Sequence, residues 1–392
     1  MAYRILTLNN ISSRGLARLP RERYEVGSKV TNPDAILVRS ADLHGFAVAP
    51  AVRAIGRAGA GVNNIPVDSL SRRGIPVFNT PGANANAVKE LVLAGLLLAA
   101  RNIGPAWLFA RALQGDDAAI EAAVEKGKKS FVGFELPGRT LGVVGLGAVG
   151  VEVANSALAL GMKVLGYDPQ LTVQRAWQLS ASVEQARSLE DLFTRSDTIT
   201  LHVPLNEGTE GLVNAERLAR MKAGATLLNF ARAAIVDSAA VVAALDTGRL
   251  HAYVCDFPSR LLKEHPRVMT LPHLGASTGE AEENCAVMVV EQVRDFLENG
   301  NIRNSVNYPE AVLPRVPNTT RLSVANRNVP NMVGQISTCL AARGINIADL
   351  LNKSRGELAY TLIDIDGSVP EAVLGKMRQI EGVLAVRVVT AI

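Results

Sequence analysis

The sequence predicts an α/β protein with doubly wound parallel sheets and a smaller βαββαβ unit at its end. Three observations predict this class. Short apolar runs alternate with helical patterns from the start, a glycine-rich turn restarts the alternation near Thr140, and the last part of the chain follows the order strand, helix, strand, strand, helix, strand. Alternating strands and helices favour parallel sheets that are covered by helices.

The first part of the chain predicts parallel βα units. Runs rich in Ile, Leu, Val or Phe are expected to form three strands, Arg4–Leu8, Ala35–Val38 and Pro76–Asn79. A helix or turn is expected at Val67–Arg73, and a long helix at Ala85–Arg101. Glycine and proline punctuate the stretch that follows, which predicts an irregular crossing between domains. The residues concerned are Gly115, Gly127, Gly133 and Pro137.

The alternation then restarts and predicts a second doubly wound sheet. Its expected strands are Leu141–Val144, Lys163–Tyr167, Thr198–His202, Ala225–Asn229 and Ala252–Cys255. Helices are expected at Ala148–Leu160 and Asn284–Leu297, and the proline-rich segment Asn307–Pro317 predicts a linker. The elements expected after the linker are Arg321–Ala325, Asn331–Arg343, Ile347–Ser354, Glu357–Asp364, Val369–Gln379 and Val383–Val389.

Composition narrows the class of protein. The 392 residues carry a formal net charge of +4 and are 48% hydrophobic and 20% charged, as in an ordinary globular protein. Lys126, Lys128 and Lys129 form a short basic cluster that is typical of a solvated loop, so no nucleic-acid partner is expected. The three cysteines fit no metal-site spacing. The N-terminus does not resemble a signal peptide, and the apolar run Leu91–Ala100 is too short for a membrane span. We therefore expect a cytoplasmic protein without a metal or a membrane partner.

A glycine motif predicts a dinucleotide site. Residues 140–150 contain G-x-G-x-x-G as Gly145, Gly147 and Gly150, between a strand and a helix. In such a motif the first glycine permits the turn, the second leaves room for a pyrophosphate, and the third allows close packing of helix and strand. Asp168 at the end of the next strand would accept hydrogen bonds from the ribose hydroxyls and repel a 2′-phosphate. The motif therefore predicts NAD rather than NADP, and a purely structural turn is the alternative.

Arginine and histidine are the residue types that a hydride transfer to or from a hydroxy acid would need. A guanidinium grips a carboxylate in two places, and an imidazole exchanges protons near neutral pH. Arg232 follows a predicted strand, and His273 lies just past another, where active sites of α/β proteins form. His202 ends a strand and could equally be a structural histidine. The other histidines, His44, His251 and His265, have the setting of surface or loop residues.

Four motifs resemble the D-isomer-specific 2-hydroxyacid dehydrogenases in order and spacing, over residues 1 to 308. They are Leu141–Gly150, His202–Leu205, Asn229–Arg232 and Pro272–Gly275. The resemblance implies a Rossmann-type NAD domain inserted in a flavodoxin-like substrate domain. The C-terminal unit resembles an ACT domain, a fold that senses amino acids. The domains so implied are 1–92 with 275–308 for substrate, 93–274 for NAD, 309–320 as linker and 321–392 as ACT domain.

The resemblance also implies roles for individual residues. Arg232 would bind the substrate carboxylate, and His273 would be the acid/base. The expected cofactor-binding residues are Gly145, Leu146, Gly147, Ala148, Val149, Gly150, Asp168, His202, Val203, Pro204, Thr209, Asn229, Ala231, Arg232, Asp256 and Gly275. The expected substrate-binding residues are Ala60, Gly61, Val62 and Asn63, with Arg39 and Arg57 for a substrate phosphate. Either of these two arginines could instead be a structural ion-pair partner.

Three positions depart from the family pattern. The family usually carries a glutamate a few residues after the aspartate that matches Asp256, to orient the histidine, and none stands at that spacing here. Glu264 or Lys263 would have to replace it. Lys89 stands where a small apolar residue is usual, and a buried lysine there could act as acid/base or phosphate ligand, unless it is simply solvated. Asn63 stands where an aspartate is common.

The combination with an ACT domain implies a specific reaction and effector. It implies NAD-dependent oxidation of 3-phospho-D-glycerate to 3-phosphohydroxypyruvate, the first step of L-serine synthesis, in a homodimer or homotetramer. L-Serine would bind between paired ACT domains through Asn326, Asn328 and Asn346, unless the domain serves only for dimerisation. The alternatives are a reductase of glyoxylate, hydroxypyruvate or another D-2-hydroxyacid, and a NAD-sensing protein of the corepressor kind.

Overall fold

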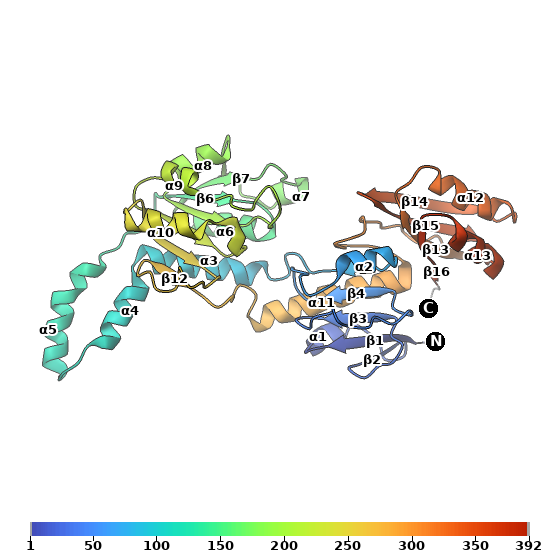
Figure 1. Ribbon diagram of the computed structural model, residues 1–392, viewed down its shortest axis with the longest axis horizontal. Helices are drawn as coiled ribbons and strands as arrows, with labels where there is room; N and C mark the ends of the chain where they lie inside the picture. Colours follow the sequence, from blue (N-terminus) through green and yellow to red (C-terminus); the bar gives the residue numbers. More distant parts are fainter. Residues whose placement is uncertain (1, 390–392) are drawn as a thin grey trace. The chain divides into compact units, whose positions relative to one another are not determined.

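The computed structural model describes residues 2–389 (Figure 1). Its contacts divide the chain into two compact units. The first unit comprises Met1–Ala83 and Glu282–Ile392, and the second comprises Asn84–Ala281. The expected domain boundary at 92/93 would fall inside a single continuous helix, α3 (Ala85–Ala100), whereas the contacts divide the chain just before this helix begins.

The first unit contains a five-stranded parallel sheet in the order β2-β1-β3-β4-β5. This is the strand order of a flavodoxin-like fold, as the family resemblance implied. The strands are β1 (Tyr3–Leu8), β2 (Tyr24–Gly27), β3 (Ala35–Val38), β4 (Ala54–Arg57) and β5 (Val77–Phe78). Two short helices, α1 (Ser13–Leu16) and α2 (Val67–Arg72), connect them. The carboxyl ends of β3 and β4 carry Arg39 and Arg57, which places both arginines at the ligand-binding edge of such a sheet.

Helix α11 (Gly279–Asn299) supplies much of the core under this sheet. Its apolar residues pack with strand residues such as Ile5 and Leu37, and those in the core are Cys285, Ala286, Val289, Val290, Val293, Phe296 and Leu297. The sequence predicted a shorter helix, 284–297, because the first turns contain a glycine and several acidic residues instead of an apolar repeat.

The second unit contains a seven-stranded parallel sheet in the order β12-β11-β10-β9-β6-β7-β8. Five of its strands were predicted: β6 (Thr140–Val144), β7 (Lys163–Tyr167), β9 (Thr198–Leu201), β10 (Ala225–Asn229) and β11 (Leu250–Cys255). The short edge strands β8 (Glu184–Gln185) and β12 (Val268–Thr270) complete it. The direction of winding reverses between β6 and β9, and the crevice at such a switch point is where ligands bind in open α/β sheets.

Six helices complete this sheet: α3, α6 (Ala148–Ala159), α7 (Val173–Ala176), α8 (Leu189–Arg195), α9 (Ala215–Arg220) and α10 (Ser238–Asp246). Helix α3 packs on α6 and on β10 and β11, so its buried face closes one side of the sheet.

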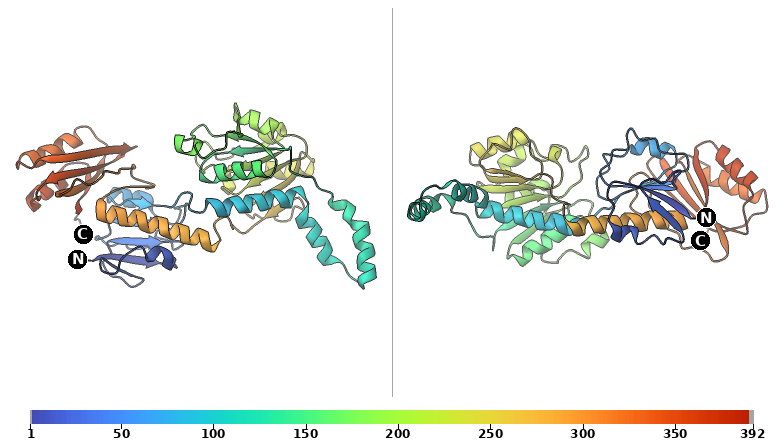
Figure 2. Two further views of the ribbon diagram at one scale, coloured as in Figure 1. Left: turned by 180° about the vertical axis from the view of Figure 1, so that it is seen from behind. Right: turned by 90° about the horizontal axis from the view of Figure 1, so that it is seen from below.

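The prediction of an irregular stretch after α3 was wrong. Residues there form α4 (Ile103–Ala112), α5 (Asp117–Gly127) and the short 3-10 helix η1 (Lys128–Phe131). Alanine-rich sequence favours helix, and Asp116 caps α5 by accepting a hydrogen bond from Ala119 N–H. Gly115 and Gly127 therefore flank or end a helix instead of marking a loop. Both long helices project from the body of the second unit (Figures 1 and 2).

The C-terminal module (residues 319–389) has the predicted order βαββαβ. It consists of β13 (Thr319–Arg327), α12 (Met332–Ala341), β14 (Ile347–Arg355), β15 (Leu358–Asp366), α13 (Glu371–Gln379) and β16 (Val383–Val389). The antiparallel sheet has the order β14-β15-β13-β16, and its two helices cover one face through Leu322, Val324 and Ile363. This arrangement is compatible with an ACT domain.

The other face of this sheet packs on the rest of the first unit. Ala325, Tyr360 and Leu362 belong to the same core as Phe296 of α11, and Tyr360 Oη donates a hydrogen bond to Gly300 O at 2.8 Å. The segment predicted as a free linker is packed as well, because Tyr308, Ala311 and Leu313 are buried. The module is therefore docked on the first unit within one chain.

A fully buried ion pair joins the module to the segment before it. The Arg321 guanidinium donates two hydrogen bonds to the Asp364 carboxylate, at 2.7 and 2.6 Å, and others to Leu313 O and Pro314 O. Both side chains are 0% exposed. Burial acts to raise the pKa of Asp364, but hydrogen bonds from Arg321 and Val316 outweigh it and keep the pKa below its usual value.

Replacing Asp364 with alanine is expected to lower the free energy of unfolding by about 3–5 kcal/mol, because the Arg321 charge would remain buried without its partner. Thermal and urea-induced unfolding would measure the loss, with Asp349→Ala, an exposed aspartate of the same module, as the control. Equal stability of the two variants would contradict this role for the ion pair.

Two further features of residues 2–389 concern metal sites and membrane-spanning helices. No group of three or more His, Cys, Asp or Glu residues in this range could hold a metal ion. No single helix in this range is long and apolar enough to span a membrane, although α3 and α4, bent by 66° at their junction, pass that test as a pair.

Candidate active site

The glycine turn between β6 and α6 has the geometry that a pyrophosphate needs. Gly145 has φ +90°, and a Cβ there would lie 2.7 Å from His202 O. A Cβ on Gly150 would lie 1.9 Å from Gly145 O. In contrast, a Cβ on Gly147 would meet no atom within 4 Å, so this position opens onto free space at the N-terminus of α6. The residues therefore fit a bound dinucleotide phosphate, with free N–H groups and the positive end of a helix dipole around it.

Asp168 stands at the end of β7, beside the glycine turn. Its carboxylate accepts hydrogen bonds from Leu146 N–H and Gln170 N–H, each at 2.8 Å. These two bonds orient the carboxylate, and each oxygen retains a lone pair for a ribose hydroxyl. A cavity of about 410 Å³ adjoins it, lined by Leu146, Tyr167 and Asp168 among others.

The loop after β9 forms the opposite wall of the turn. The Thr209 hydroxyl donates to Pro204 O at 2.5 Å and accepts from Asn206 N–H at 2.9 Å, so the residue folds this loop. Val203 lies against the glycine turn, 2.9 Å from the Cβ position of Gly145. His202 Nε2 lies 3.0 Å from Thr200 Oγ1. Burial lowers the pKa of His202 to about 3, so the ring is neutral at neutral pH.

The neutral state of His202 predicts acid sensitivity. Below its ordinary pKa of 6.5 the unfolded chain binds a proton that the folded chain accepts only near pH 3. Stability contributed by this group should therefore fall as pH drops from 6.5 toward 3, by about 2 kcal/mol at pH 5. His202→Asn should flatten this part of the stability curve measured by thermal unfolding between pH 7 and 5. An unchanged curve would show that another group dominates.

Arg232 is held by the turn after β10. Asn229 is fully buried, accepts a hydrogen bond from Ala231 N–H at 3.1 Å and donates to Arg232 O at 2.9 Å. This network folds the backbone around Arg232, whose own Nη1 donates to Ala231 O at 2.6 Å. Within residues 2–389, no carboxylate forms an ion pair with Arg232. Its guanidinium can therefore receive a carboxylate from a ligand.

His273 occupies a loop that Asp256 holds in place. Asp256 is 1% exposed at the end of β11, and its two oxygens accept hydrogen bonds from Leu274 N–H at 2.8 Å and Gly275 N–H at 2.9 Å. His273 itself has φ +57°, a left-handed conformation that is uncommon for histidine. Its exposed ring meets Phe257 edge-on, with the ring centroids 5.3 Å apart. Asp256 thus fixes the backbone on which the imidazole stands.

The two substitutes that the sequence offered for the missing glutamate gain no support from the structure. Glu264 is 79% exposed, and its partner is Lys263 at 3.7 Å. Within residues 2–389, no carboxylate is hydrogen-bonded to the His273 ring. Lys89 is only partly buried and donates to Asn86 Oδ1 at 2.5 Å. An acid/base role of the kind suggested for a buried lysine would require fuller burial than this.

A loop in the first unit presents free backbone N–H groups. Among residues 2–389, no acceptor receives a hydrogen bond from the N–H of Ala60, Gly61 or Val62. Asn79 Nδ2 donates to Ala60 O at 2.6 Å, and Thr80 N–H donates to Gly59 O at 3.1 Å, so the loop is fixed from one side. Unpaired N–H groups on a fixed loop form a site for an anion such as a carboxylate.

Arg57 covers this loop. Its Nη1 lies 1.8 Å from the position that a Cβ on Gly59 would occupy, so only glycine leaves room for the guanidinium there. Arg57 Nε donates to Arg39 O at 3.0 Å. Arg39 forms an ion pair with Glu282 at 2.6 Å, with the Arg39 side chain 34% exposed. Asn63 is exposed on the same loop.

Three residues of the site were not predicted. Asn79 holds the loop of Ala60, Gly61 and Val62, Phe257 contacts the His273 ring, and Glu282 pairs with Arg39. Asn79 and Phe257 each follow the end of a strand, and this position in the sequence could have indicated that they belong to the site. Glu282 has no local signal, because it lies far along the chain from the arginine it meets.

The predicted effector residues do not meet within one chain. Asn328 donates to Gly356 O at 3.1 Å at one end of the module's sheet, whereas Asn346 donates to Asp366 Oδ2 at 2.8 Å at the other. Nine-residue strands separate these ends by about 25 Å. Asn326 is 1% exposed near the Asn328 end, and its Oδ1 is buried with no partner among the described residues.

Comparison with known proteins supports one family. Residues 96–275 match the model described as D-isomer specific 2-hydroxyacid dehydrogenase, NAD binding domain. A D-3-phosphoglycerate dehydrogenase of Haemophilus influenzae is 33% identical over 87% of this chain and 82% of its own length. One of Synechocystis is 40% identical over 73% of this chain, but the match spans only 50% of that relative.

Solved structures of 2-hydroxyacid dehydrogenases have a similar fold. The apo D-mandelate dehydrogenase of Rhodotorula graminis has a TM-score of 0.68 at 25% identity, covering 80% of this chain and 99% of its own. The NAD⁺-bound 3-phosphoglycerate dehydrogenase of Entamoeba histolytica has a TM-score of 0.60 at 25% identity, covering 78% and 99%.

Proposed function

Because the chain belongs to the D-isomer-specific 2-hydroxyacid dehydrogenases and contains their NAD-binding domain, we propose that it oxidises 3-phospho-D-glycerate to 3-phosphohydroxypyruvate. The curated relatives compared above carry the name of this activity. The observation that carries the choice of substrate is the anion site of the first unit. Free N–H groups at Ala60, Gly61 and Val62 stand beside the Arg57 guanidinium, a combination suited to a substrate with two anionic groups.

In the proposed reaction the residues of the second unit carry out the chemistry at C2. His273 takes the hydroxyl proton, and Arg232 binds the carboxylate and stabilises the developing carbonyl dipole. NAD⁺, when bound, accepts the hydride. Asp256 positions His273 through Leu274 and Gly275, and Asn229 positions Arg232 through its backbone. In the first unit, Ala60, Gly61, Val62 and Asn63 are proposed to contact the substrate carboxylate, and Arg39 and Arg57 its phosphate.

NADH oxidation with purified protein tests this assignment. 3-Phosphohydroxypyruvate should be preferred over glyoxylate, hydroxypyruvate and 2-oxoglutarate, and Arg57→Met should remove most of that preference. Arg18→Met, at an exposed ion pair with Glu291, is a matched control. Activity on the unphosphorylated acids alone would contradict the proposed substrate. Partner binding without NADH turnover would instead favour a NAD-sensing binding protein.

A reductase of glyoxylate or hydroxypyruvate is the second candidate, and the Arg39–Glu282 ion pair is the observation that favours it. An arginine whose charge is already neutralised by a carboxylate binds a phosphate less well. Glu282→Gln distinguishes the two, because releasing Arg39 should lower the KM for a phosphorylated substrate only if Arg39 contacts the phosphate.

We further propose that L-serine regulates the enzyme through the C-terminal module. Asn328 and Asn346 lie at opposite ends of one sheet, so an effector that contacts both needs two modules paired along their β14 edges. Serine should then inhibit NADH oxidation, and Asn346→Ala should relieve the inhibition. A module that serves only for dimerisation would give no serine effect.

We also propose that the enzyme is a homodimer or homotetramer. Helices α4 and α5 contain no buried residue, and Trp107 and Leu108 are 58% and 63% exposed. Two helices with apolar, uncovered side chains need a partner surface. Leu108→Asp should therefore lower the molar mass measured by light scattering, whereas Glu121→Lys on α5 should not. An unchanged mass would contradict a role of α4 in assembly.

A cytoplasmic location is proposed on the state of the cysteines. Cys255, Cys285 and Cys339 are all free, and the first two are buried. Buried thiols without disulfides are typical of a reducing compartment.

A further inference from the structure

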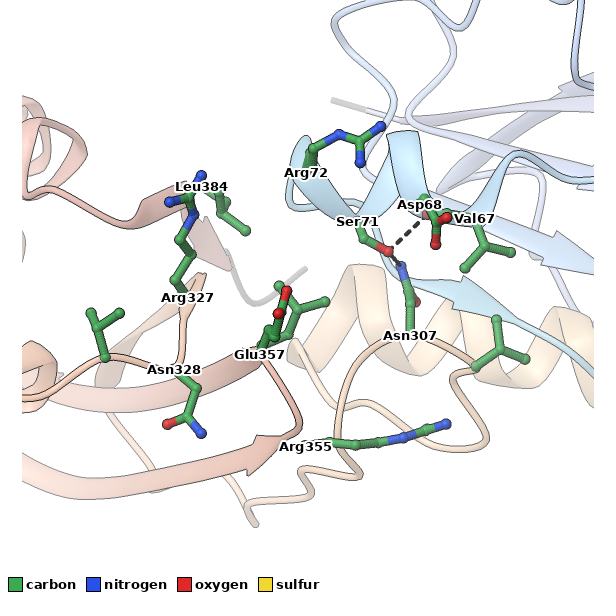
Figure 3. Close-up of a pocket in the computed structure, with 13 residues that line it drawn as sticks. Val67, Asp68, Ser71, Arg72, Asn307, Arg327, Asn328, Arg355, Glu357 and Leu384 are labelled. Carbon is green, nitrogen blue, oxygen red and sulfur yellow. Dashed lines mark hydrogen bonds between the residues drawn. The ribbon is translucent and has the colours of Figure 1, made fainter. Parts of the chain in front are cut away.

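A large polar cavity lies within the first unit, and its lining does not include Ala60, Gly61 or Val62 of the loop with free N–H groups. Its volume is about 870 Å³. One wall is helix α2, and the other consists of the end of β13 and the hairpin between β14 and β15 of the C-terminal module (Figure 3). The cavity therefore joins two parts of the chain that the sequence separates by more than two hundred residues.

Charged side chains of both signs line this cavity without pairing. Asp68 and Arg72 come from α2, and Arg327, Arg355 and Glu357 come from the module. Within the described residues 2–389, none of the five forms an ion pair. Figure 3 shows Glu357 between Arg327 and Asn328 on one side and the α2 residues on the other. Three guanidinium groups and two carboxylates thus line one cavity without forming ion pairs with one another.

Hydrogen bonds connect the residues at the floor of the cavity. Asn307 Nδ2 donates to Ser71 Oγ and to Ile75 O, each at 2.9 Å, and its Oδ1 accepts from Val77 N–H. Arg355 Nη1 donates to Ser305 O at 3.0 Å, which holds that side chain across the junction. Asn328 bonds Gly356 O through Nδ2, and its amide oxygen is left as an acceptor. The charged side chains that lack an ion-pair partner are therefore attached to backbone and amide groups that already have hydrogen-bond partners.

We propose that this cavity binds a small zwitterion, an α-amino acid, between α2 and the C-terminal module. A simple anion would meet the two carboxylates, and a simple cation would meet the three guanidinium groups. A ligand with both a carboxylate and an ammonium group neutralises both sets, through charge-assisted hydrogen bonds to arginine on one end and to Asp68 or Glu357 on the other. This site shares Asn328 with the paired-edge serine site proposed above, but it differs from that site because Asp68 and Arg72 of α2 line it and Asn346 does not.

Such a ligand would tie the module to the substrate-binding part of the first unit. Because α2 and the module each supply charged groups, bound ligand stabilises their contact, and it stabilises the folded chain by mass action. The binding residues on α2 are the decisive ones. An amino acid that bound only to the C-terminal module would be indifferent to Asp68 and Arg72.

Calorimetric titration of the full chain with L-serine, glycine and L-aspartate tests the proposal without any turnover, so it stands or falls independently of the proposed reaction. At least one of the three should bind. Asp68→Asn and Arg327→Met should each weaken that binding by roughly tenfold or more, the usual effect of losing a charged hydrogen-bond partner. Arg343→Met, at an exposed arginine of the module outside the cavity, is the matched control and should bind like the unchanged protein.

Three results would overturn the proposal. The first is no binding of any of the three amino acids. The second is binding that Asn346→Ala abolishes while Asp68→Asn and Arg327→Met leave it intact, which would place the ligand at the paired edges. The third is binding of inorganic phosphate, tested in the same way, that is tighter than that of every amino acid and insensitive to Asp68→Asn, which would make the cavity a simple anion site. Thermal unfolding of each variant without ligand shows that it is folded.

Discussion

Replacing His273 with alanine is expected to lower kcat by roughly two to four orders of magnitude, the usual contribution of a general acid/base. The imidazole would accept the substrate's hydroxyl proton during oxidation and return it during reduction. No carboxylate within residues 2–389 is hydrogen-bonded to this ring. The ring is positioned through its backbone, because Asp256 accepts hydrogen bonds from the N–H groups of Leu274 and Gly275. Steady-state kinetics with NADH and 3-phosphohydroxypyruvate measure the loss.

The backbone of His273 calls for a second variant. Its φ of +57° is disfavoured for alanine but tolerated by asparagine, so His273→Asn removes the acid/base while keeping the loop. Both variants should lose kcat similarly. His44→Ala, at an exposed histidine paired with Asp42, is the control and should be silent. A small effect at His273 together with a large one for Lys89→Ala would move the acid/base to the lysine.

Much of the fold could be predicted because local patterns decide it. Strand β3 is a continuous apolar run, and β7 and β10 contain the buried apolar pairs Val164-Leu165 and Leu227-Leu228, as strands of a parallel sheet covered on both faces do; all three were placed correctly. The strands missed in the first unit, β2 and β4, are short and contain glycine or charged residues. Helices α4 and α5 were missed because their glycines were given more weight than their alanines.

The features of the candidate site that could be predicted are likewise the local ones, and those that could not depend on contacts between distant parts of the chain. Gly145, Gly147 and Asp168 form one local motif, and the structure places them together as expected. The double hydrogen bond of Asp256 to Leu274 and Gly275 joins residues far apart in sequence, and spacing alone did not reveal it. For the same reason the Arg39–Glu282 pair and the docking of the C-terminal module could not be predicted, since both depend on tertiary contacts with α11.

Replacing Gly147 with valine is expected to weaken NAD binding strongly while leaving the protein folded. The ideal Cβ of residue 147 meets no atom within 4 Å, and its φ of −71° is ordinary for any residue. The chain itself therefore has room for the side chain. The space that valine would fill is the space beside the α6 N-terminus where the pyrophosphate approaches the backbone. We expect the Kd for NADH, measured by fluorescence titration, to rise by about a hundredfold or more, with Tm nearly unchanged.

The neighbouring glycine provides the contrast that makes this test specific. In Gly150→Val the new Cβ would lie 1.9 Å from Gly145 O, so the turn itself must deform and Tm should fall together with NADH affinity. Gly45→Ala, at an exposed glycine outside the motif with open space around its Cβ position, controls for a general effect of filling a surface position. If Gly147→Val bound NADH normally, the open space at residue 147 would not be the phosphate site. If Gly147→Val lost stability as Gly150→Val does, the loss of binding would be a consequence of unfolding instead of steric exclusion.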